Sequence, residues 1–423
     1  MGLLRYAVFT SAIALLFHFA MDTFYTKFPL HFGGEVDSQY EGVQNAFEQN
    51  FIEGLEAEGA SVAVYVKGRK VVDLWGGYAD IQSAKTWKQN TISIVFSTTK
   101  AVAALCIAML ADRGRLKYDD LVSKHWPGFA KNGKENITIE WVLSQMAGLY
   151  YIETPITKEM VLDHNLMREV LENEAPKFPP GTMSGYHALS YGWLIDQIIR
   201  HTDEKQRGVG QFFREEIAEP HGIDFHIGLN TSEEYRVAHT SPIKTSAILK
   251  EIFHDYHVAV LLLSYFLTDK DTPMKKTNNP SWLLANESAM NNPEHHAMEQ
   301  AAGLGIGNAR SLAKMFSLVV SGKLISEKTM TLLSKPTING TDYVIQLPLA
   351  YGHGFIYHPP IISEGSFIIG HGGYGCQEVN FDTTNEVVIA YVTNAMKAGM
   401  HDSCRTYARL QNAVYDVVRQ SKT

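Results

Sequence analysis

The pattern of apolar and polar positions changes along the chain from strand-like to helical. Residues 61–66 and 71–75 are rich in β-branched and aromatic residues, and Gly68 lies in the short segment between them. Two such runs, joined by a short segment with a turn glycine, predict an antiparallel hairpin. Residues 98–113 are instead rich in Ala, Leu and Met, and Gly114 follows where a left-handed helix cap is expected. The chain therefore predicts a hairpin followed by a long buried helix.

Helices and loops fill the middle of the chain, from residue 115 to about 300, and strands return near its end. The apolar run 258–267 is too short to cross a bilayer and predicts a core helix. Strand patterns resume from residue 351 onward. The elements expected in this last part are strands at 367–370, 377–381 and 386–392 and a helix at 403–418. Strands at both chain ends around a helical middle predict an α+β fold, a sheet domain interrupted by a helical insertion.

The amino terminus carries an apolar run, residues 6–21, which is preceded by a single basic residue, Arg5. The run is long enough for the core of a signal peptide and short for a membrane span. His18 stands where a small residue would complete a cleavage motif ending at Ala20, so an uncleaved anchor competes with a cleaved signal. We interpret residues 1–25 as a signal or anchor that leaves the body membrane-anchored, lumenal or secreted. A mitochondrial presequence and an extension packed on the body are the alternatives.

Composition indicates a folded, globular body and argues against one class of binding partner. The 423 residues are 45% hydrophobic and 19% charged, which excludes a disordered chain. The formal net charge is −8 and no basic block exceeds a pair such as Lys275-Lys276, which argues against nucleic acid as a partner. The three cysteines, Cys106, Cys376 and Cys404, are too few for a disulfide framework and include no CxxC pair. They leave the redox compartment open.

Two further kinds of motif carry less weight. Histidine-rich stretches at 254–257 and 294–296 lack the spacing of known metal sites, so we expect locally satisfied histidines and no metal. Four Asn-x-Ser/Thr sequons are compatible with a lumenal or extracellular body, although roughly two would arise by chance in such a chain. These sequons begin at Asn136, Asn230, Asn286 and Asn339.

The first candidate for chemistry is a Ser-x-x-Lys pair at the expected start of the long helix. At this spacing Ser97 and Lys100 lie on one helix face, with Cβ atoms roughly 5–6 Å apart. A serine hydroxyl is a poor nucleophile until a base takes its proton, and a neutral lysine can do so. The free N–H groups of a helix start also favour a developing oxyanion. The same spacing recurs at 241–244 and 311–314, so an N-cap serine followed by a solvated lysine is the alternative.

The second candidate is Tyr186. A Pro-Gly-Thr turn at 180–182 fixes the backbone and could aim the phenol into a cleft. A tyrosine acts as a general base only where nearby cations stabilise its phenolate. A core tyrosine with a satisfied hydroxyl is the alternative.

The third candidate is the segment His371, Gly372 and Gly373, which directly follows an expected strand. Glycines at a strand edge allow a substrate to approach the backbone and pair with it like an added strand. The N–H of Tyr374 could then complete an oxyanion hole with the N–H of Ser97. A loop histidine without chemistry is the alternative.

These three elements occur in the order and at about the separations of one family. Over about residues 40–418 the chain resembles the serine β-lactamase-related superfamily. The similar branch contains class C β-lactamases, D-Ala-D-Ala carboxypeptidases, esterases and animal β-lactamase-like proteins. Further segments that resemble this branch are 59–63, 110–116, 137–144 and 351–355.

The resemblance implies a β-lactamase/transpeptidase-like fold with its active site between two parts. A mixed α/β part, about 40–110 and 300–418, would pack on an all-helical insertion, about 111–299. No metal or organic cofactor is implied.

The resemblance also implies a role for each candidate residue. Ser97 would be the acylated nucleophile, and Lys100 would help to deprotonate it. Tyr186 would serve as base toward Ser97 and as acid toward the leaving group. The backbone of Ser97 and Tyr374 would hold the oxyanion, while the segment 371–373 would bind substrate.

Two departures from the family pattern affect the expected substrate. Ala188 stands where many relatives have Asn, and His371 stands where β-lactamases usually carry a permanently charged Lys. We therefore expect a serine hydrolase that acts on an ester or amide of a small-molecule or peptide substrate, with weak or no β-lactamase activity. The alternative is a catalytically silent scaffold or self-assembling protein that keeps the fold. A homo-oligomer is compatible with either function.

Overall fold

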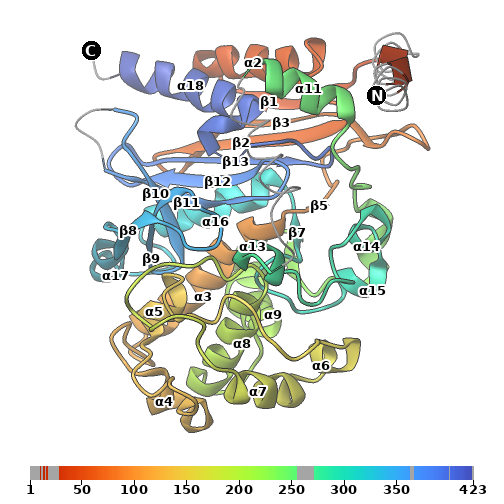
Figure 1. Ribbon diagram of the computed structural model, residues 1–423. Coiled ribbons are helices and arrows are strands. Elements are labelled where there is room, and N and C mark those ends of the chain that lie inside the picture. Colours follow the sequence, from red (N-terminus) through yellow and green to blue (C-terminus); the bar gives the residue numbers. More distant parts are fainter. Residues whose placement is uncertain are drawn as a thin grey trace.

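A large antiparallel sheet forms the centre of the computed structural model (Figure 1). The structure describes residues 10, 13–14, 16–17, 28–254, 271–362, 366–399 and 401–421. Strands follow each other in the order β1-β3-β2-β13-β12-β11-β10-β9-β8, and β4 pairs with β3. The strands of this sheet are β1 (Phe32–Val36), β2 (Gly59–Val66), β3 (Arg69–Asp80), β4 (Lys85–Thr86), β8 (Ile338–Thr341), β9 (Pro348–Gly352), β10 (Phe355–His358), β11 (Ile368–Gly373), β12 (Gln377–Asp382) and β13 (Val387–Thr393). A small second sheet contains β5 (Ser93–Ile94), β7 (Gly305–Gly307) and β6 (Phe225–Ile227), in that order.

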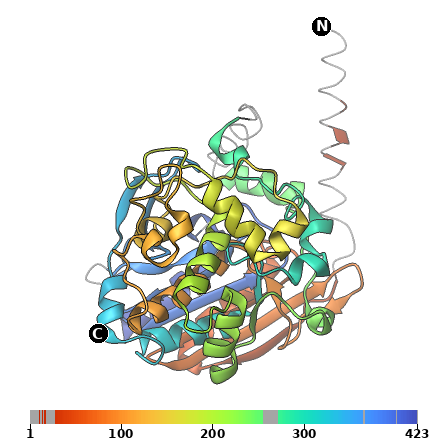
Figure 2. The same cartoon turned by 90° about the horizontal axis from the view of Figure 1, so that it is seen from below.

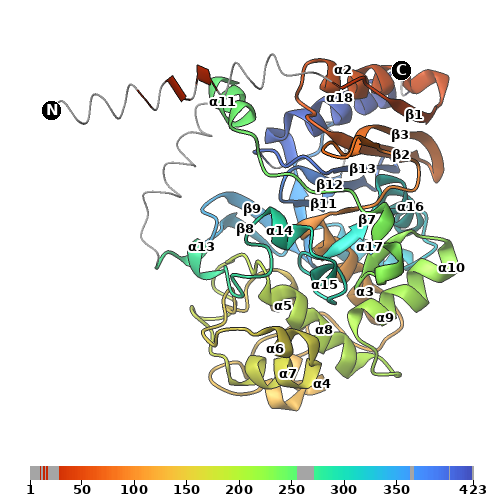
Figure 3. The same cartoon turned by 90° about the vertical axis from the view of Figure 1, so that its right-hand side faces the viewer.

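Helices cover both faces of the large sheet. The α-helices of the described residues are α2 (Glu41–Ile52), α3 (Thr99–Asp112), α4 (Val122–His125), α5 (Ile139–Leu143), α6 (Lys158–Leu162), α7 (His164–Asn173), α8 (Ser190–Thr202), α9 (Val209–Phe213), α10 (Glu219–His221), α11 (Thr245–His254), α13 (Pro273–Lys276), α14 (Glu287–Met290), α15 (Pro293–His296), α16 (Ala309–Val320), α17 (Glu327–Leu333) and α18 (Arg405–Gln420). Helices α2 and α18 lie together on one face, and α16 packs on the other (Figures 1 and 3). Helix α3 also contacts β10 and β11, and helices α4 to α9 pack around it; Figure 2 shows these helices from below with the sheet behind them.

Both ends of the chain meet in the sheet, as the sequence pattern predicted. Strand β13 pairs with β2 in an antiparallel register that runs from Val387 opposite Val66 to Thr393 opposite Ala60. The helical middle of the chain therefore connects two halves of one sheet. This arrangement confirms the expected α+β fold class.

The first predicted elements are confirmed. Strands β2 and β3 form a hairpin whose turn residues, Lys67 and Gly68, have φ of 51° and 74°. Positive φ at two turn residues gives a hairpin twist that suits the flanking strands. Helix α3 ends before Gly114, which has φ of 70° and donates its N–H to the Ala111 carbonyl (3.0 Å). All its side chains from Thr99 to Leu110 are buried, which explains why the helix shows no polar face.

The strands and the helix predicted for the last part of the chain are confirmed, but the predicted start of this second strand region was wrong. Strands β11, β12 and β13 and helix α18 occupy the expected segments with small shifts at their ends. Two strands, β8 and β9, begin before residue 351, at Ile338 and Pro348. Strand β8 lies at the edge of the sheet and is mostly exposed. Because its sequence is Ile-Asn-Gly-Thr, it has no buried face that could produce an apolar alternation.

Two expectations fall on segments that the structure largely leaves undescribed. The predicted core helix 258–267 lies outside the described residues, as does most of the apolar run 6–21. Among the residues that are described, no helix combines the length and apolar character needed to cross a membrane.

Candidate active site

Ser97 lies at the junction between a short 3-10 helix, η2 (Phe96–Thr98), and the start of α3. Phe96 has φ of 45°, an uncommon conformation for a residue with a side chain. The hydroxyl of Thr99 donates to the Phe96 carbonyl (2.5 Å) and accepts the N–H of Gly305 in β7 (2.9 Å). These bonds hold the junction in place, and the Ser97 side chain reaches the surface while its neighbours are buried.

Lys100 lies in the first turn of α3 and is fully buried. Its Nζ is 3.2 Å from the Ser97 Oγ, and it donates to the carbonyls of Ala188 (2.9 Å) and Ala302 (2.8 Å). No carboxylate appears among these contacts. Burial therefore holds the pKa of the Lys100 ammonium well below its usual value.

Tyr186 faces the same two side chains. The Lys100 Nζ lies 4.8 Å from the centre of its ring. Burial raises the pKa of the Tyr186 phenol, and the Ser97 hydroxyl offsets only part of that rise. The side chain is therefore a neutral phenol at physiological pH.

The loop that carries Tyr186 is held by two residues that the sequence did not identify as part of the site. Gln145 accepts the N–H of Gly185 on its carbonyl (2.8 Å) and that of His187 on its side-chain oxygen (2.8 Å). Asp342, which follows β8 and is fully buried, accepts the N–H of Tyr186 (3.2 Å). Nothing in the sequence near Asp342 indicated this role, because it lies 156 residues away along the chain.

His371 and the two glycines after it form the end of β11, next to η2. A Cβ on Gly373 would lie 2.3 Å from the Val95 carbonyl oxygen, so only glycine allows this close approach. The His371 ring is buried, with its centre 6.2 Å from that of Tyr186. Its Nδ1 contacts the Gly372 carbonyl (2.7 Å), and burial lowers the pKa of the His371 imidazole to about 3. The ring is therefore neutral and carries no fixed positive charge.

Tyr374 follows directly and is half exposed. Its ring meets Phe96 edge-on, with ring centres 5.7 Å apart. This contact places the turn after β11 beside the junction that carries Ser97. The expected residues Ser97, Lys100, Tyr186 and His371 thus share one site.

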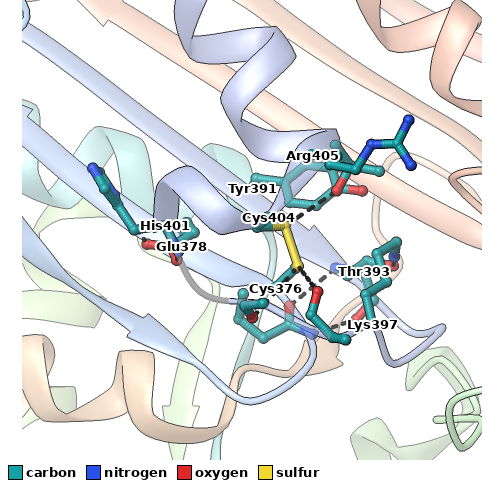
Figure 4. Close-up of a disulfide and its surroundings, with 12 residues drawn as sticks. Cys376, Glu378, Tyr391, Thr393, Lys397, His401, Cys404 and Arg405 are labelled. Atoms are coloured by element: carbon teal, nitrogen blue, oxygen red, sulfur yellow. Dashed lines mark hydrogen bonds and ion pairs between the residues drawn. A yellow bond between two sulfur atoms is a disulfide. The ribbon is translucent and has the colours of Figure 1, made fainter. Parts of the chain in front are cut away.

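A disulfide fastens this turn to the segment that precedes α18 (Arg405–Gln420) (Figure 4). Cys376, two residues after Tyr374, is bonded to Cys404, which directly precedes α18. The sequence left these cysteines unassigned, because 28 residues separate them and no local pattern links them. The third cysteine, Cys106, is free and buried in α3.

The competing motifs have structural roles. The Ser241 hydroxyl donates to Glu58 (3.0 Å), and the Lys314 ammonium donates to the His221 carbonyl (2.6 Å), so neither additional Ser-x-x-Lys pair forms a comparable site. His295 and His296 contact nearby backbone carbonyls. Within the described residues, no group of three or more His, Cys, Asp or Glu is placed to hold a metal ion.

Comparison with known proteins identifies relatives of this chain. Among curated proteins, the chain is 38% identical over 196 residues to the esterase/beta-lactamase LipL of Mycobacterium tuberculosis. The matched residues make up 46% of this chain and 44% of that protein. It is also 28% identical over 178 residues to protein flp of Staphylococcus aureus, 40% of this chain and 35% of that protein. The matched parts span less than half the length of these curated relatives.

Solved structures match over nearly the whole described chain. A family VIII carboxylesterase superposes with a TM-score of 0.78 at 28% identity, and a penicillin-binding protein homologue from Caulobacter crescentus with 0.77 at 31%. Each match covers 92% of this chain and 100% of the other. These matches confirm the β-lactamase/transpeptidase-like fold. Because the family model Beta-lactamase also matches residues 46–413, this chain belongs to the Beta-lactamase family.

Proposed function

We propose that this protein is a serine hydrolase that cleaves an ester or amide bond through an acyl-enzyme on Ser97. The observation that carries the proposal is the buried Lys100 amine, 3.2 Å from the Ser97 hydroxyl. The names of its relatives, an esterase/beta-lactamase and a carboxylesterase, agree with this class of reaction.

The contacts of Lys100 support its role as the base. A neutral amine has two N–H groups and one lone pair. When the two N–H groups donate to the Ala188 and Ala302 carbonyls, the lone pair is left for the Ser97 hydroxyl. As the Ser97 Oγ bonds to the substrate carbonyl carbon, its proton passes to the Lys100 Nζ.

Tyr186 then supplies the proton for the leaving group. Because its pKa is raised, Tyr186 is protonated at rest, so it holds a proton for a departing alkoxide or amine and does not act as a resting base. Its own proton is replaced from the Lys100 ammonium. The C–O or C–N bond breaks, and the acyl group remains on Ser97. Water next attacks the acyl carbon with Lys100 again as base, and the Ser97 Oγ takes the proton back.

The backbone around Ser97 would stabilise the oxyanion in both steps. The N–H groups of Ser97 and Tyr374 are the proposed donors, since the turn after β11 lies against η2. Two preorganised donors of this kind typically contribute several kcal/mol to the transition state, roughly 3–4 kcal/mol for each.

Two residues near the nucleophile favour esters over β-lactams. Ala188 offers no side-chain amide, so an acylamino group placed there would lose a partner at a cost of roughly 1–3 kcal/mol if buried. The neutral His371 offers no fixed charge for a substrate carboxylate. An activated ester requires neither contact.

Covalent labelling tests the proposal. A fluorophosphonate probe should label the folded protein on Ser97, as mapped by mass spectrometry of the modified peptide. Ser97→Ala should abolish labelling, whereas Ser311→Ala, which removes the serine of a Ser-x-x-Lys pair in a structural role, should retain it. Absence of labelling on protein that unfolds cooperatively would instead favour the silent scaffold.

A further inference from the structure

The four Asn-x-Ser/Thr sequons all lie on the surface of the folded body. Their asparagines are exposed and belong to separate elements. They are Asn136 in the loop before α5, Asn230 before the 3-10 helix η5 (Thr231–Arg236), Asn286 before α14 and Asn339 in β8. A bulky substituent on any of them would therefore project into solvent.

The side-chain nitrogens of these asparagines do not take part in the fold. Within the described part of the chain, none of the four donates a hydrogen bond through Nδ2. Asn230 and Asn286 use only their side-chain oxygens, which accept backbone N–H groups (both 3.0 Å) in the turns that follow. By contrast, Asn291 and Asn394, which are not in sequons, donate through Nδ2 to backbone carbonyls. Substitution on the Nδ2 atoms of the sequon asparagines would therefore break no hydrogen bond among the described residues.

The disulfide is a second, independent observation. Cys376 and Cys404 are both fully buried and bonded, so the native fold contains the oxidised pair (Figure 4). Disulfides of this structural kind form and persist in the secretory lumen and outside the cell. The same lumen is where asparagines of sequons are glycosylated.

We propose that the body of this protein matures in an oxidising lumen, where Asn136, Asn230, Asn286 and Asn339 receive N-linked glycans. The co-reactant would be a polyprenyl-diphosphate oligosaccharide. The Nδ2 atom bonds to the anomeric carbon of the first sugar, the bond from that carbon to the diphosphate oxygen breaks, and one Nδ2 proton is released.

The glycan on Asn339 would have a particular consequence for the sheet. Strand β8 is an edge of the large sheet and, among the described strands, pairs only with β9. An exposed edge is a site where another chain can add a strand. A glycan on β8 would block that addition, whereas one on Asn136 in a loop would not.

The test is expression of the full chain, residues 1–423, in cultured insect cells. Its intact mass is measured before and after treatment with peptide:N-glycosidase F, and a non-reducing peptide map records the cysteines. We expect a glycosidase-sensitive mass excess and a linked Cys376–Cys404 peptide. Asn339→Gln and Thr341→Ala should each remove the same glycan, while Asn165→Gln, at an exposed asparagine outside any sequon, should leave the mass unchanged.

Further outcomes test the compartment, the acceptor asparagines and the edge-blocking role separately. An unmodified mass, or free thiols at Cys376 and Cys404, would overturn it. If glycans appear only when a known secretion signal precedes the full chain, the proposed compartment is wrong. If they are absent even then, the acceptor assignment is wrong. Light scattering should show faster aggregation for Asn339→Gln than for Asn136→Gln, and equal rates would overturn the edge-blocking role.

Discussion

Removing the Cys376–Cys404 disulfide should destabilise the protein and also slow its acylation. The bond closes a loop of 28 residues in the unfolded chain. In the chain-entropy description, a loop of that length corresponds to about 3.5 kcal/mol of stabilisation at 25 °C. The double substitution Cys376→Ala/Cys404→Ala should therefore lower the free energy of unfolding by roughly this amount, plus a smaller contribution from the two lost sulfurs.

Urea unfolding at equilibrium measures this difference, and Cys106→Ala is the matched control. Cys106 is equally buried but free, so its substitution reports the cost of deleting a packed sulfur without deleting a crosslink. The double variant should lose clearly more than twice the control. A loss no larger than twice the control would refute the reasoning that the crosslink stabilises the fold.

The effect on acylation follows from the position of the bond. Cys376 ends the turn that begins at Tyr374, and both Gly375 and Cys376 have positive φ, 79° and 75°. Without the crosslink this turn has one fewer constraint, and a displacement on the order of 1 Å is enough to cost up to about 10²-fold in rate. Acylation by a p-nitrophenyl ester, measured well below the denaturation midpoint, should slow by about 10- to 100-fold. An unchanged rate in the folded double variant would show that the turn is positioned without the disulfide.

Three further predictions concern charge. Lys100→Ala should lower the acylation rate about 10²–10⁴-fold in stopped-flow measurements with an ester probe. Lys100→Arg should not restore the rate, because arginine stays protonated. Near-normal acylation by the arginine variant would exclude the role of Lys100 as the base. The unmodified protein should hydrolyse short p-nitrophenyl esters and turn over little chromogenic cephalosporin. The double substitution Ala188→Asn with His371→Lys should shift the ratio of the two kcat/KM values toward the cephalosporin. Efficient cephalosporin turnover by the unmodified protein would contradict this prediction. Burial raises the pKa of Glu378 to about 7, so the folded state binds this proton more tightly than the unfolded chain does. The stability that comes from this difference is fully present below about pH 4.5. It is lost, by about 3 kcal/mol, as the pH rises through 7. Glu378→Gln should flatten that pH dependence in urea titrations, and an unchanged slope would show that another group causes it.

The amino-acid sequence by itself determined the local elements and supplied the candidates for the site residues. The hairpin of β2 and β3, helix α3 and its glycine cap follow from residue preferences that act over a few positions. The spacing of Ser97 and Lys100 predicted that their side chains share one helix face, whatever the rest of the fold does. Because the same spacing recurs at 241–244 and 311–314, the resemblance to the family was needed to single out this pair.

Tertiary structure decided the features that depend on contacts between distant segments. The carbonyls that receive the Lys100 N–H groups belong to residues 88 and 202 positions away, and burial among them lowers its pKa. The same holds for Asp342 against the Tyr186 backbone and for the Cys376–Cys404 bond. The local periodicity of apolar residues indicates which face of an element is buried, but it does not indicate which distant atoms bury that face. Desolvation and hydrogen bonding act through those distant atoms, so the electrostatics of this site emerged only once the chain was folded.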